Sequence, residues 1–271
     1  VIHNHGYEVT LSSPVIDNTF KWHLSGNMAF NESIVEELAI EADEFFAGRI
    51  GMNVDVPVNI IREGEVLSSY YGYVEDGLTE DGLIQYKDLD ENGEINDDDR
   101  KILGNPYPDL VYGVNSKMSY GSFYLHLFLD GVYGQKVFNR QYWLIANSMA
   151  RNANQLEIVK NRWTEDDPDP NAKFPRASTE SPRVSDRHFQ DASYLRFKNL
   201  VLGYNMPVSD WGIDWLQTAR IYVSAQNFIT ITDFVGYDPE IRAAAAGSLT
   251  KGVNNGNPTT KSFNIGLSVK F

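Results

Sequence analysis

The feature that most constrains the fold of this chain is the strict alternation of apolar and polar side chains in its last ten residues, SFNIGLSVKF. Successive side chains of a β-strand point to opposite faces, so an unbroken period of two predicts a strand with one apolar and one polar face. The apolar face carries Phe263, Ile265, Leu267, Val269 and Phe271. If the strand crosses a membrane, we expect these residues to face lipid and Asn264, Ser268 and Lys270 to face a lumen.

The same alternation recurs along the chain. FKWHLSGNMAF near the start, and VYGVNSKMSY and FYLHLFLDG in the middle, place apolar residues largely at every second position. In SYLRFKNLVLGY the phase changes near Lys198 and Asn199, which predicts a β-bulge. Together these patterns predict seven strands, at roughly 6–14, 19–29, 110–120, 123–133, 193–206, 218–229 and 261–271.

Connections of two kinds separate these strands. Short turns such as Asp17-Asn18 and Gly121-Ser122 alternate with three long polar segments, at about 31–109, 134–192 and 230–260. Short turns at one end and long loops at the other are typical of a transmembrane antiparallel β-barrel, whose strands need about 9–11 residues to cross a bilayer. The sequence therefore predicts an all-β fold, with a soluble β-sandwich as the alternative at this point.

Helical spacing is confined to the long segments. NESIVEELAIEADEFF (31–46) starts with a capping asparagine and predicts a helix, and NQLEIVKNRW (154–163) predicts a second one. The sequence contains no run of about 18 apolar residues, so it predicts no membrane-spanning helix. The first residues, VIHNHGYEV, lack the pattern of a signal peptide and enter a strand-like pattern at once, so we expect the chain to begin within a longer protein.

Charge and composition exclude several classes of function. The formal net charge is −14, with 37 acidic and 23 basic residues, which disfavours binding to nucleic acid. The absence of cysteine excludes disulfide scaffolds, cysteine-ligated zinc and thiol catalysis. No nucleophile, phosphate-loop or zinc-protease motif is present, and the carboxylates of 90–99 and 165–169 lie in loop sequence, so we expect no catalytic residue and no enzyme.

The segment DLDENGEINDDD (88–99) matches the twelve-residue loop of an EF-hand. The flanking sequences LIQYK and LGNPYPD are extended and turn-like rather than helical, so a paired calcium sensor is excluded. We expect a structural cation, Ca²⁺ by the ligand types, that folds this loop; a solvated acidic loop is the alternative. The expected ligands are Asp88, Asp90, Asn92, the Glu94 carbonyl and Asp99.

Three residues beyond the end of the fourth strand are candidates for contact with a substrate. Tyr142 and Trp143 lie in the polar segment FNRQYWLIANSMARNANQ, next to amide side chains that include Asn139. Flat aromatic rings beside amides suit stacking on sugar faces, and they suit loop packing equally well. Both interpretations stay open at this point.

Several long phrases resemble the C-terminal part of SusC/RagA-like TonB-dependent outer-membrane transporters. The resemblance runs over most of residues 67–271, with the phrases in the family's order. They are YGYVEDGL, YKDLDENGEINDDDRKILGNPYPDLVYG, SDRHFQDASYLRFKNLVLGYNMP, SAQNFITITDFVGYDPE and the terminal SFNIGLSVKF.

This resemblance implies a barrel of about 22 strands around a plug. It also implies uptake of glycan fragments or peptides across the outer membrane of a Gram-negative bacterium, with the long loops extracellular and with energy from the TonB complex. A SusD-like surface lipoprotein is the expected lid. This chain shows no plug and only seven strands, so we expect the rest of the transporter, which contacts TonB, to complete the barrel in the lipid.

Two other classes of function remain as alternatives. One is a secreted, calcium-stabilised β-module that binds glycans, and the other is a glycan hydrolase that uses loop carboxylates. The terminal phenylalanine of an alternating strand favours the transporter, since it resembles the signal for assembly of outer-membrane barrels.

Overall fold

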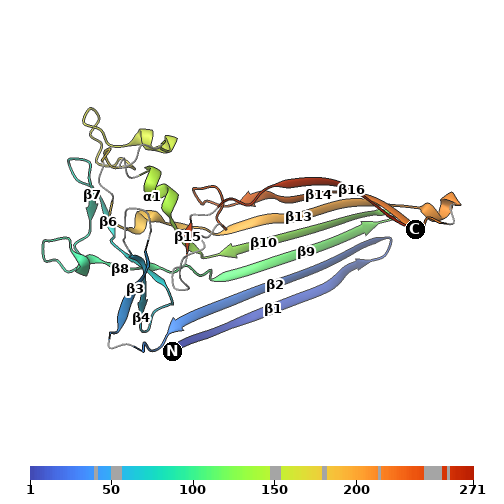
Figure 1. The fold of residues 1–271 in the computed structure, drawn as a ribbon, viewed down its shortest axis with the longest axis horizontal. Coiled ribbons are helices and arrows are strands. Elements are labelled where there is room, and N and C mark those ends of the chain that lie inside the picture. The colour runs from blue at the N-terminus through green and yellow to red at the C-terminus, as the bar shows by residue number, and fades with distance from the viewer. Residues whose placement is uncertain are drawn as a thin grey trace.

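The computed structural model describes residues 1–39, 42–49, 57–146, 154–178, 182–212, 215–240, 252–254 and 257–271. A long antiparallel sheet extends to one side, and the long connections between its strands gather into a lobe at one end of it (Figure 1). We call this lobe the head; it consists of the described parts of 36–109, 134–193 and 232–261. No helix in the described residues is long and apolar enough to cross a membrane.

Seven strands form the sheet, and each pairs with its neighbours in antiparallel register, in the order in which they occur in the chain. All seven predicted strands are confirmed, and several are longer than predicted. They are β1 (Ile2–Asp17), β2 (Phe20–Val35), β9 (Leu110–Tyr120), β10 (Phe123–Tyr133), β13 (Tyr194–Met206), β14 (Thr218–Ile231) and β16 (Ser262–Lys270).

The predicted bulge near Lys198 and Asn199 is also confirmed. The register of β13 shifts against both neighbours between Phe197 and Asn199. On β14 the bulge is accommodated by Asn227, which has a positive φ of 50°. The extra residue brings the apolar side chains on either side of the bulge to the same face of the sheet.

The register places the apolar residues of all seven strands on one face. Leu267 pairs with Ile221, which pairs with Tyr204, and the row continues through Phe123 to Tyr120. Most of this face is exposed, and Leu267 has 66% of its surface accessible. A large exposed apolar face is the pattern of a sheet that faces lipid rather than water.

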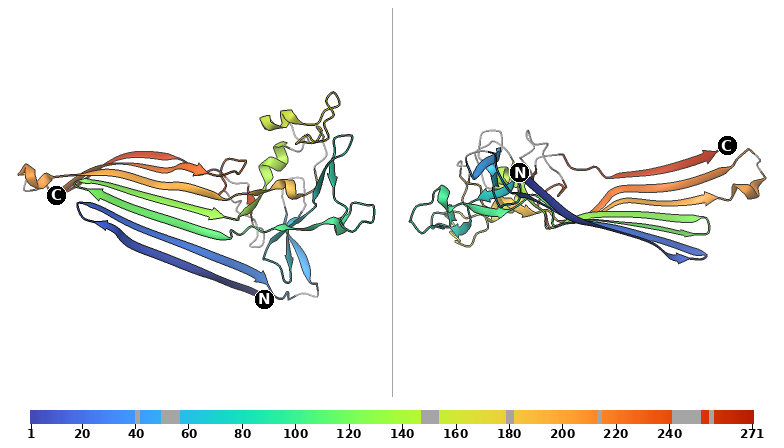
Figure 2. Two further views of the ribbon diagram at one scale, coloured as in Figure 1. Left: turned by 180° about the vertical axis from the view of Figure 1, so that it is seen from behind. Right: turned by 90° about the horizontal axis from the view of Figure 1, so that it is seen from below.

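The two outer strands, β1 and β16, lie at opposite edges of the sheet and do not pair with each other. Figure 2 shows these edges from behind and from below. The three short turns lie at the end of the sheet far from the head, and the last of them contains the 3₁₀ turn η4 (Val208–Trp211). Phe271 lies at this same end (Figure 1), so the long segments all gather at the opposite end, as the sequence predicts.

Small sheets and single turns build the head. A four-stranded sheet has the order β3-β4-β5-β8, a three-stranded sheet has the order β12-β11-β15, and β6 pairs with β7. The strands are β3 (Glu44–Arg49), β4 (Pro57–Arg62), β5 (Ser69–Gly72), β6 (Glu75–Leu78), β7 (Ile84–Tyr86), β8 (Lys101–Gly104), β11 (Lys136–Asn139), β12 (Phe189–Asp191) and β15 (Val253–Asn254). The helical elements are α1 (Arg140–Ala146) and the 3₁₀ turns η1 (Asp97–Asp99), η2 (Glu157–Asn161) and η3 (Asp186–His188).

The prediction of a helix at 31–46 is wrong. β2 continues to Val35, and β3 begins at Glu44; residues 40 and 41 lie outside the described part. The Val35 N–H donates to the Glu65 carbonyl, and the Leu67 N–H donates to the Ser33 carbonyl. Pairing with this distant segment keeps the chain extended and overrides the local helical spacing.

The second predicted helix, 154–163, is also wrong in type, because this segment forms only the short 3₁₀ turn η2. The α-helix α1, which the sequence analysis did not predict, begins directly after β11. The Asn139 side chain accepts a hydrogen bond of 2.9 Å from the Tyr142 N–H, which satisfies one of the free donors at the start of this helix.

Candidate functional sites: the acidic loop and the boundary of the head

The acidic loop, residues 88–99, lies between β7 and β8. The carboxylates of Asp88, Asp90 and Asp99 offer oxygens that lie within 4.8 Å of one another. Gly93 has a φ of 88°, which permits the sharp turn at the sixth position of the loop. The strand β7 precedes the loop, as its extended sequence predicts, and the strand β8, which was not predicted, follows it. The helices of a paired EF-hand are therefore lacking in the described residues on both sides.

Backbone N–H groups organise the loop around these carboxylates. The two oxygens of Asp88 accept from the N–H groups of Asn92 at 3.2 Å and Gly93 at 2.7 Å. The Asn92 side-chain oxygen accepts from the Glu94 N–H at 2.7 Å. These bonds draw the chain around the oxygens of the first, third and fifth loop positions, where an EF-hand holds its cation.

Asp99 closes the loop from inside. Its residue is 0% exposed, and its two oxygens accept from the N–H groups of Leu89 at 2.6 Å and Asn96 at 2.8 Å. The Asn96 side chain in turn accepts from the Asp98 N–H, so a reciprocal capping box begins η1. Leu89 near the start of the loop and Asn96 near its end are thus both bound to the Asp99 carboxylate.

The protonation of these carboxyl groups differs. The hydrogen bond from the backbone N–H of Asn96 lowers the pKa of Asp99 most; burial opposes it, and the N–H of Leu89 adds to it, so that the pKa lies below its ordinary value. The pKa of Asp90 is raised, first by desolvation and then by its hydrogen bond to Asp88 and the nearby charge of Asp99. The charged form of Asp90 is therefore less favourable in this loop than in water.

Aromatic and basic residues of the head hold the acidic loop in place. The Arg183 guanidinium lies 4.8 Å from the Tyr73 ring and 5.7 Å from the Tyr86 ring, and it donates to the Ile95 carbonyl at 3.1 Å. The Tyr73 hydroxyl contacts an Asp97 oxygen at 3.2 Å. Burial raises the pKa of Tyr86 to about 12, so its hydroxyl stays protonated at neutral pH.

The remaining predicted site residues lie inside the head. Trp143 is 2% exposed and packs in a cluster with Phe138 and Tyr70, and Tyr142 is 6% exposed and packs against Phe174. Asn139 donates to the Val235 carbonyl at 2.6 Å and to the Gln190 side chain at 3.0 Å. In this arrangement these three residues support the head, and contact between them and a substrate stays a prediction.

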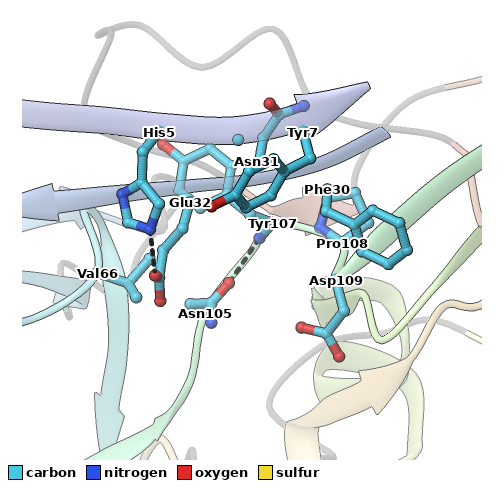
Figure 3. Close-up of a pocket in the computed structure, with 11 residues that line it drawn as sticks. His5, Tyr7, Phe30, Asn31, Glu32, Val66, Asn105, Tyr107, Pro108 and Asp109 are labelled. Carbon is cyan, nitrogen blue, oxygen red and sulfur yellow. Dashed lines mark hydrogen bonds and ion pairs between the residues drawn. The ribbon is translucent and has the colours of Figure 1, made fainter. Parts of the chain in front are cut away.

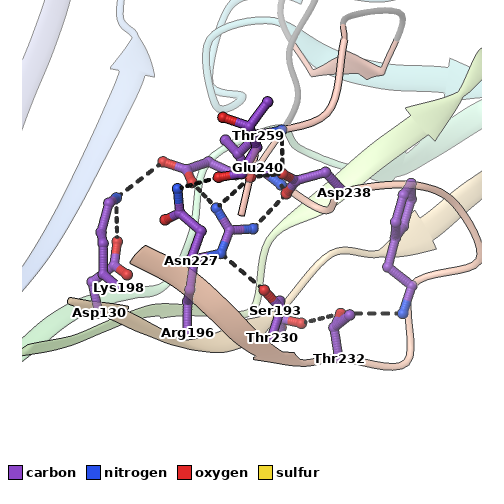
Figure 4. A network of polar contacts seen from close by, with 12 residues as sticks. Asp130, Ser193, Arg196, Lys198, Asn227, Thr230, Thr232, Asp238, Glu240 and Thr259 are labelled. Atoms are coloured by element: carbon purple, nitrogen blue, oxygen red, sulfur yellow. Dashed lines mark hydrogen bonds and ion pairs between the residues drawn. The ribbon is translucent and has the colours of Figure 1, made fainter. Parts of the chain in front are cut away.

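A polar network that the sequence analysis did not predict joins the sheet to the head (Figure 4). Arg196 of β13 is 1% exposed and forms ion pairs with Asp238 and Glu240. Thr259 donates a hydrogen bond to the same Asp238 carboxylate. Burial alone would raise the pKa of Asp238, but the hydrogen bonds from Thr259, the Glu240 N–H and Arg196 lower it below its ordinary value.

A second ion pair, which the sequence analysis also did not predict, joins a segment that precedes the acidic loop in the chain to a segment that follows it. Arg187 donates to the two carboxylate oxygens of Glu75 at 2.7 Å and 2.8 Å, and both side chains are mostly buried. The partners are 112 positions apart in the chain. No local pattern in the sequence links such residues, so only the pairing of distant segments could reveal them.

Comparison with known proteins gives matches over the whole chain. TonB-dependent receptor P3 of Formosa agariphila is 33% identical over 292 residues, and TonB-dependent receptor SusC of Bacteroides thetaiotaomicron is 25% identical over 281 residues. The matches cover 100% of this chain but only 29% and 26% of these relatives, respectively. No protein-family model matches the chain.

Solved structures give the same result for the fold. A structure of the RagAB peptide transporter matches all of this chain and 29% of its own chain, with a TM-score of 0.84 and 22% sequence identity. A structure of the RagAB peptide importer in its "open-open" state matches with a TM-score of 0.80. The named relatives and neighbours are receptors and transporters, not enzymes. This chain is homologous, over its whole length, to part of the SusC-like TonB-dependent receptors.

Proposed function

We propose that this chain forms part of the wall and the extracellular head of an outer-membrane transporter that imports glycan fragments. The single observation that supports this most strongly is the seven-stranded sheet, whose exposed face is apolar across every strand. Such a face is stable in lipid, and backbone groups at the sheet edges must be paired there. We therefore expect the rest of the transporter to supply the neighbours of β1 and β16.

The partners follow from the same proposal. A SusD-like lipoprotein closes over the head from outside the cell, and the plug and the TonB complex act through the remainder of the transporter. The similarity to SusC and the name RagAB support a transporter of this two-component kind. The head, with its buried core and its ion pairs, lies at the end of the sheet where such a lid would sit.

Peptides are the second candidate substrate, because the structural neighbours are named as a peptide transporter and importer. Uptake by cells that carry the intact transporter and its lid separates the two. We expect labelled oligosaccharides to accumulate and oligopeptides of similar mass not to accumulate. The reverse result would assign the transporter to peptides, and accumulation of neither would contradict the proposed import.

We also propose that the acidic loop holds a structural Ca²⁺. The ligands are the side chains of Asp88, Asp90, Asn92 and Asp99 and the Glu94 carbonyl, all oxygen donors of the kind that Ca²⁺ prefers. The convergence of three carboxylates within 4.8 Å supports this, and the raised pKa of Asp90 indicates a charge that a cation would compensate. The cation would hold the loop against Arg183 and Tyr73 and so stiffen the head.

Titration of the metal-free intact transporter with Ca²⁺ tests this proposal. We expect Ca²⁺ to slow hydrogen exchange of the backbone across 88–99. We expect Asp90→Asn to raise the half-saturating Ca²⁺ concentration by about tenfold or more. Asp98→Asn is the matched control, since Asp98 is exposed, acidic and in the same loop but outside the ligand set. Equal effects of the two substitutions, or no protection by Ca²⁺, would contradict the site.

A further inference from the structure

A crevice of about 260 Å³ lies where the head-end halves of β1 and β2 meet the head (Figure 3). Tyr7 and Phe30 line one part of it, and Tyr107 reaches it from the segment that precedes β9. His5, Glu32 and Asp109 line another part and supply ionisable groups. The crevice is therefore amphipathic, with rings and carboxylates within one small space.

The register of β1 and β2 shows which side of the sheet the crevice opens on. Tyr7 pairs with Phe30, and His5 pairs with Glu32. These positions are in phase with Val9, which lies on the apolar, exposed face of the sheet. The crevice is thus on the outer wall, at the border between the apolar face and the head, and not in the lumen.

The apolar part is open to the surroundings. Phe30 of β2 is 43% exposed, and Tyr7 is 77% exposed in this chain, where β1 forms the edge of the sheet. Two aromatic side chains at the border between an apolar belt and a polar region are suited to the interface of a membrane, where one end of a ring meets acyl chains and the other meets polar groups. An acyl chain could follow this surface without leaving the bilayer.

The polar part favours a ligand with hydroxyl groups. His5 Nε2 lies 3.3 Å from a Glu32 oxygen, and the Asp109 residue is exposed and carries a second carboxylate. Carboxylates accept hydrogen bonds from hydroxyl donors, and they repel phosphate groups. The volume is below the roughly 300–1,000 Å³ of pockets for drug-sized ligands, so a single sugar ring is a better match than an oligosaccharide.

We propose that this crevice binds the sugar headgroup of a neutral glycolipid in the outer leaflet. The sugar ring would lie beside Tyr107 and donate hydroxyl hydrogens to Glu32 and Asp109, while the acyl chains would lie along Tyr7 and Phe30. The proposal rests on the orientation of the proposed function, with the head outside the cell. It concerns a lipid that stays bound on the wall and not the transported substrate.

Native mass spectrometry of the intact transporter, released from nanodiscs, tests the proposal. Separate nanodiscs contain a monoglucosyl diacylglycerol, the same diacylglycerol without sugar, or phosphatidylglycerol, and a fourth sample receives free glucose. We expect the transporter to retain the glucosyl lipid and not the other three. The double substitution Glu32→Gln/Asp109→Asn should lower retention by about tenfold or more, as for the loss of a charge-assisted hydrogen bond.

Glu8→Gln is the matched control, because Glu8 lies on the same strand but faces the opposite side of the sheet from Tyr7. If the double variant does not assemble, the single substitution Asp109→Asn at an exposed position serves instead. Equal retention of the glucosyl and sugar-free lipids, or an unchanged retention in the crevice variants, would overturn the proposal.

Substrate uptake by the same variants is a separate readout. Normal uptake with lost lipid retention supports both proposals, and absent uptake by the unaltered transporter counts against the import function alone.

Discussion

The sheet and the head use the same kinds of residue in opposite ways. In β14, which has a neighbouring strand on each edge, Ile221 and Val223 are each 43% exposed, whereas all four residues of β5, SYYG, are buried. Tyr120 of the sheet is 62% exposed, and Tyr70 of the head is 0% exposed. The sheet thus leaves its apolar surface for a surrounding apolar medium, and the head buries its apolar surface within itself.

This difference shows where each region obtains its stability. The head has a core of its own, which includes Val58, Phe138 and Trp143, and it adds buried ion pairs between distant segments. The sheet has backbone hydrogen bonds and cross-strand contacts but no second layer in the described residues. The stability of the head should therefore depend on its packing and its buried charges. The stability of the sheet should depend on the polarity of its outer face.

The largest expected effect is at the boundary between the two regions. Arg196→Met leaves the buried carboxylate of Asp238 without its guanidinium and should destabilise the protein by about 3–5 kcal/mol. The head should detach from the sheet first, so hydrogen exchange of 232–240 should rise more than that of β14. The free energy of unfolding in lipid vesicles and the exchange of these amides are the measurements.

Lys198→Met is the control for this prediction. Lys198 pairs with Asp130 at 2.8 Å and with Glu240 at 3.5 Å, but it is 36% exposed, so the loss should be about 0–1 kcal/mol. The double substitution Arg196→Met/Asp238→Leu removes both buried charges and should recover part of the stability. A loss at Lys198 as large as the loss at Arg196 would break the distinction between a buried and an exposed contact at this boundary.

The second prediction tests the sheet alone. Leu267→Arg places a charge on the apolar outer face near the middle of β16 and should destabilise by about 2–4 kcal/mol. Ser268→Arg adds the same side chain on the opposite face and should cost much less. Urea unfolding in lipid vesicles measures both, and equal losses would indicate a strand that is solvated on its two faces.

The sheet was predictable because its rules are local. Every second residue of 262–270 meets the same medium, so the period of two appears in the sequence itself, and even the bulge after Phe197 appears as a change of phase. The acidic loop was recognised for a similar reason, since all its expected ligands lie within twelve residues. In both cases the neighbours that decide the structure are near in the chain.

The head was not predictable in this way. The extended form of Ser33 to Val35 depends on the segment around Val66, and β11 pairs with β15 more than 100 positions further along the chain. The helical spacing of 31–46 was a genuine local pattern, but pairing with these distant segments outweighed it. Trp143 likewise could have been an exposed platform or a core residue until its neighbours Phe138 and Val184 were known.

A third effect, smaller than the first two over a single pH unit, should separate the two regions by pH. Burial lowers the pKa of His188 from 6.5 to about 3, and its Nε2 has no hydrogen-bond partner among the described residues. Since the unfolded state then binds more protons between these two values, the head should lose stability as the pH falls from about 6.5 towards 3. The loss is about 1.4 kcal/mol per pH unit.

Hydrogen exchange at several pH values, corrected for the intrinsic rate, checks this prediction. Protection of the segment around η3 should fall between pH 6.5 and pH 4, while protection of β9 and β10 should change little. His188→Gln removes the titrating group and should flatten the dependence in the head. A pH dependence that is the same in the sheet and in the head, or that persists in the variant, would refute the assignment to His188.

The smallest expected effect concerns the contact between the acidic loop and the rest of the head. Arg183→Lys keeps the positive charge but loses the flat guanidinium that lies over Tyr73 and Tyr86, which should cost about 0.5–2 kcal/mol. The contact to the Ile95 carbonyl is the part that a lysine ammonium could replace. If Ca²⁺ folds the loop and the loop then docks on Arg183, the variant should weaken Ca²⁺ binding by at most the factor by which Ca²⁺ strengthens docking. Exchange of 88–99 with and without Ca²⁺ measures both quantities, and a variant with unchanged Ca²⁺ affinity would mean that the loop folds independently of the head to which it is attached.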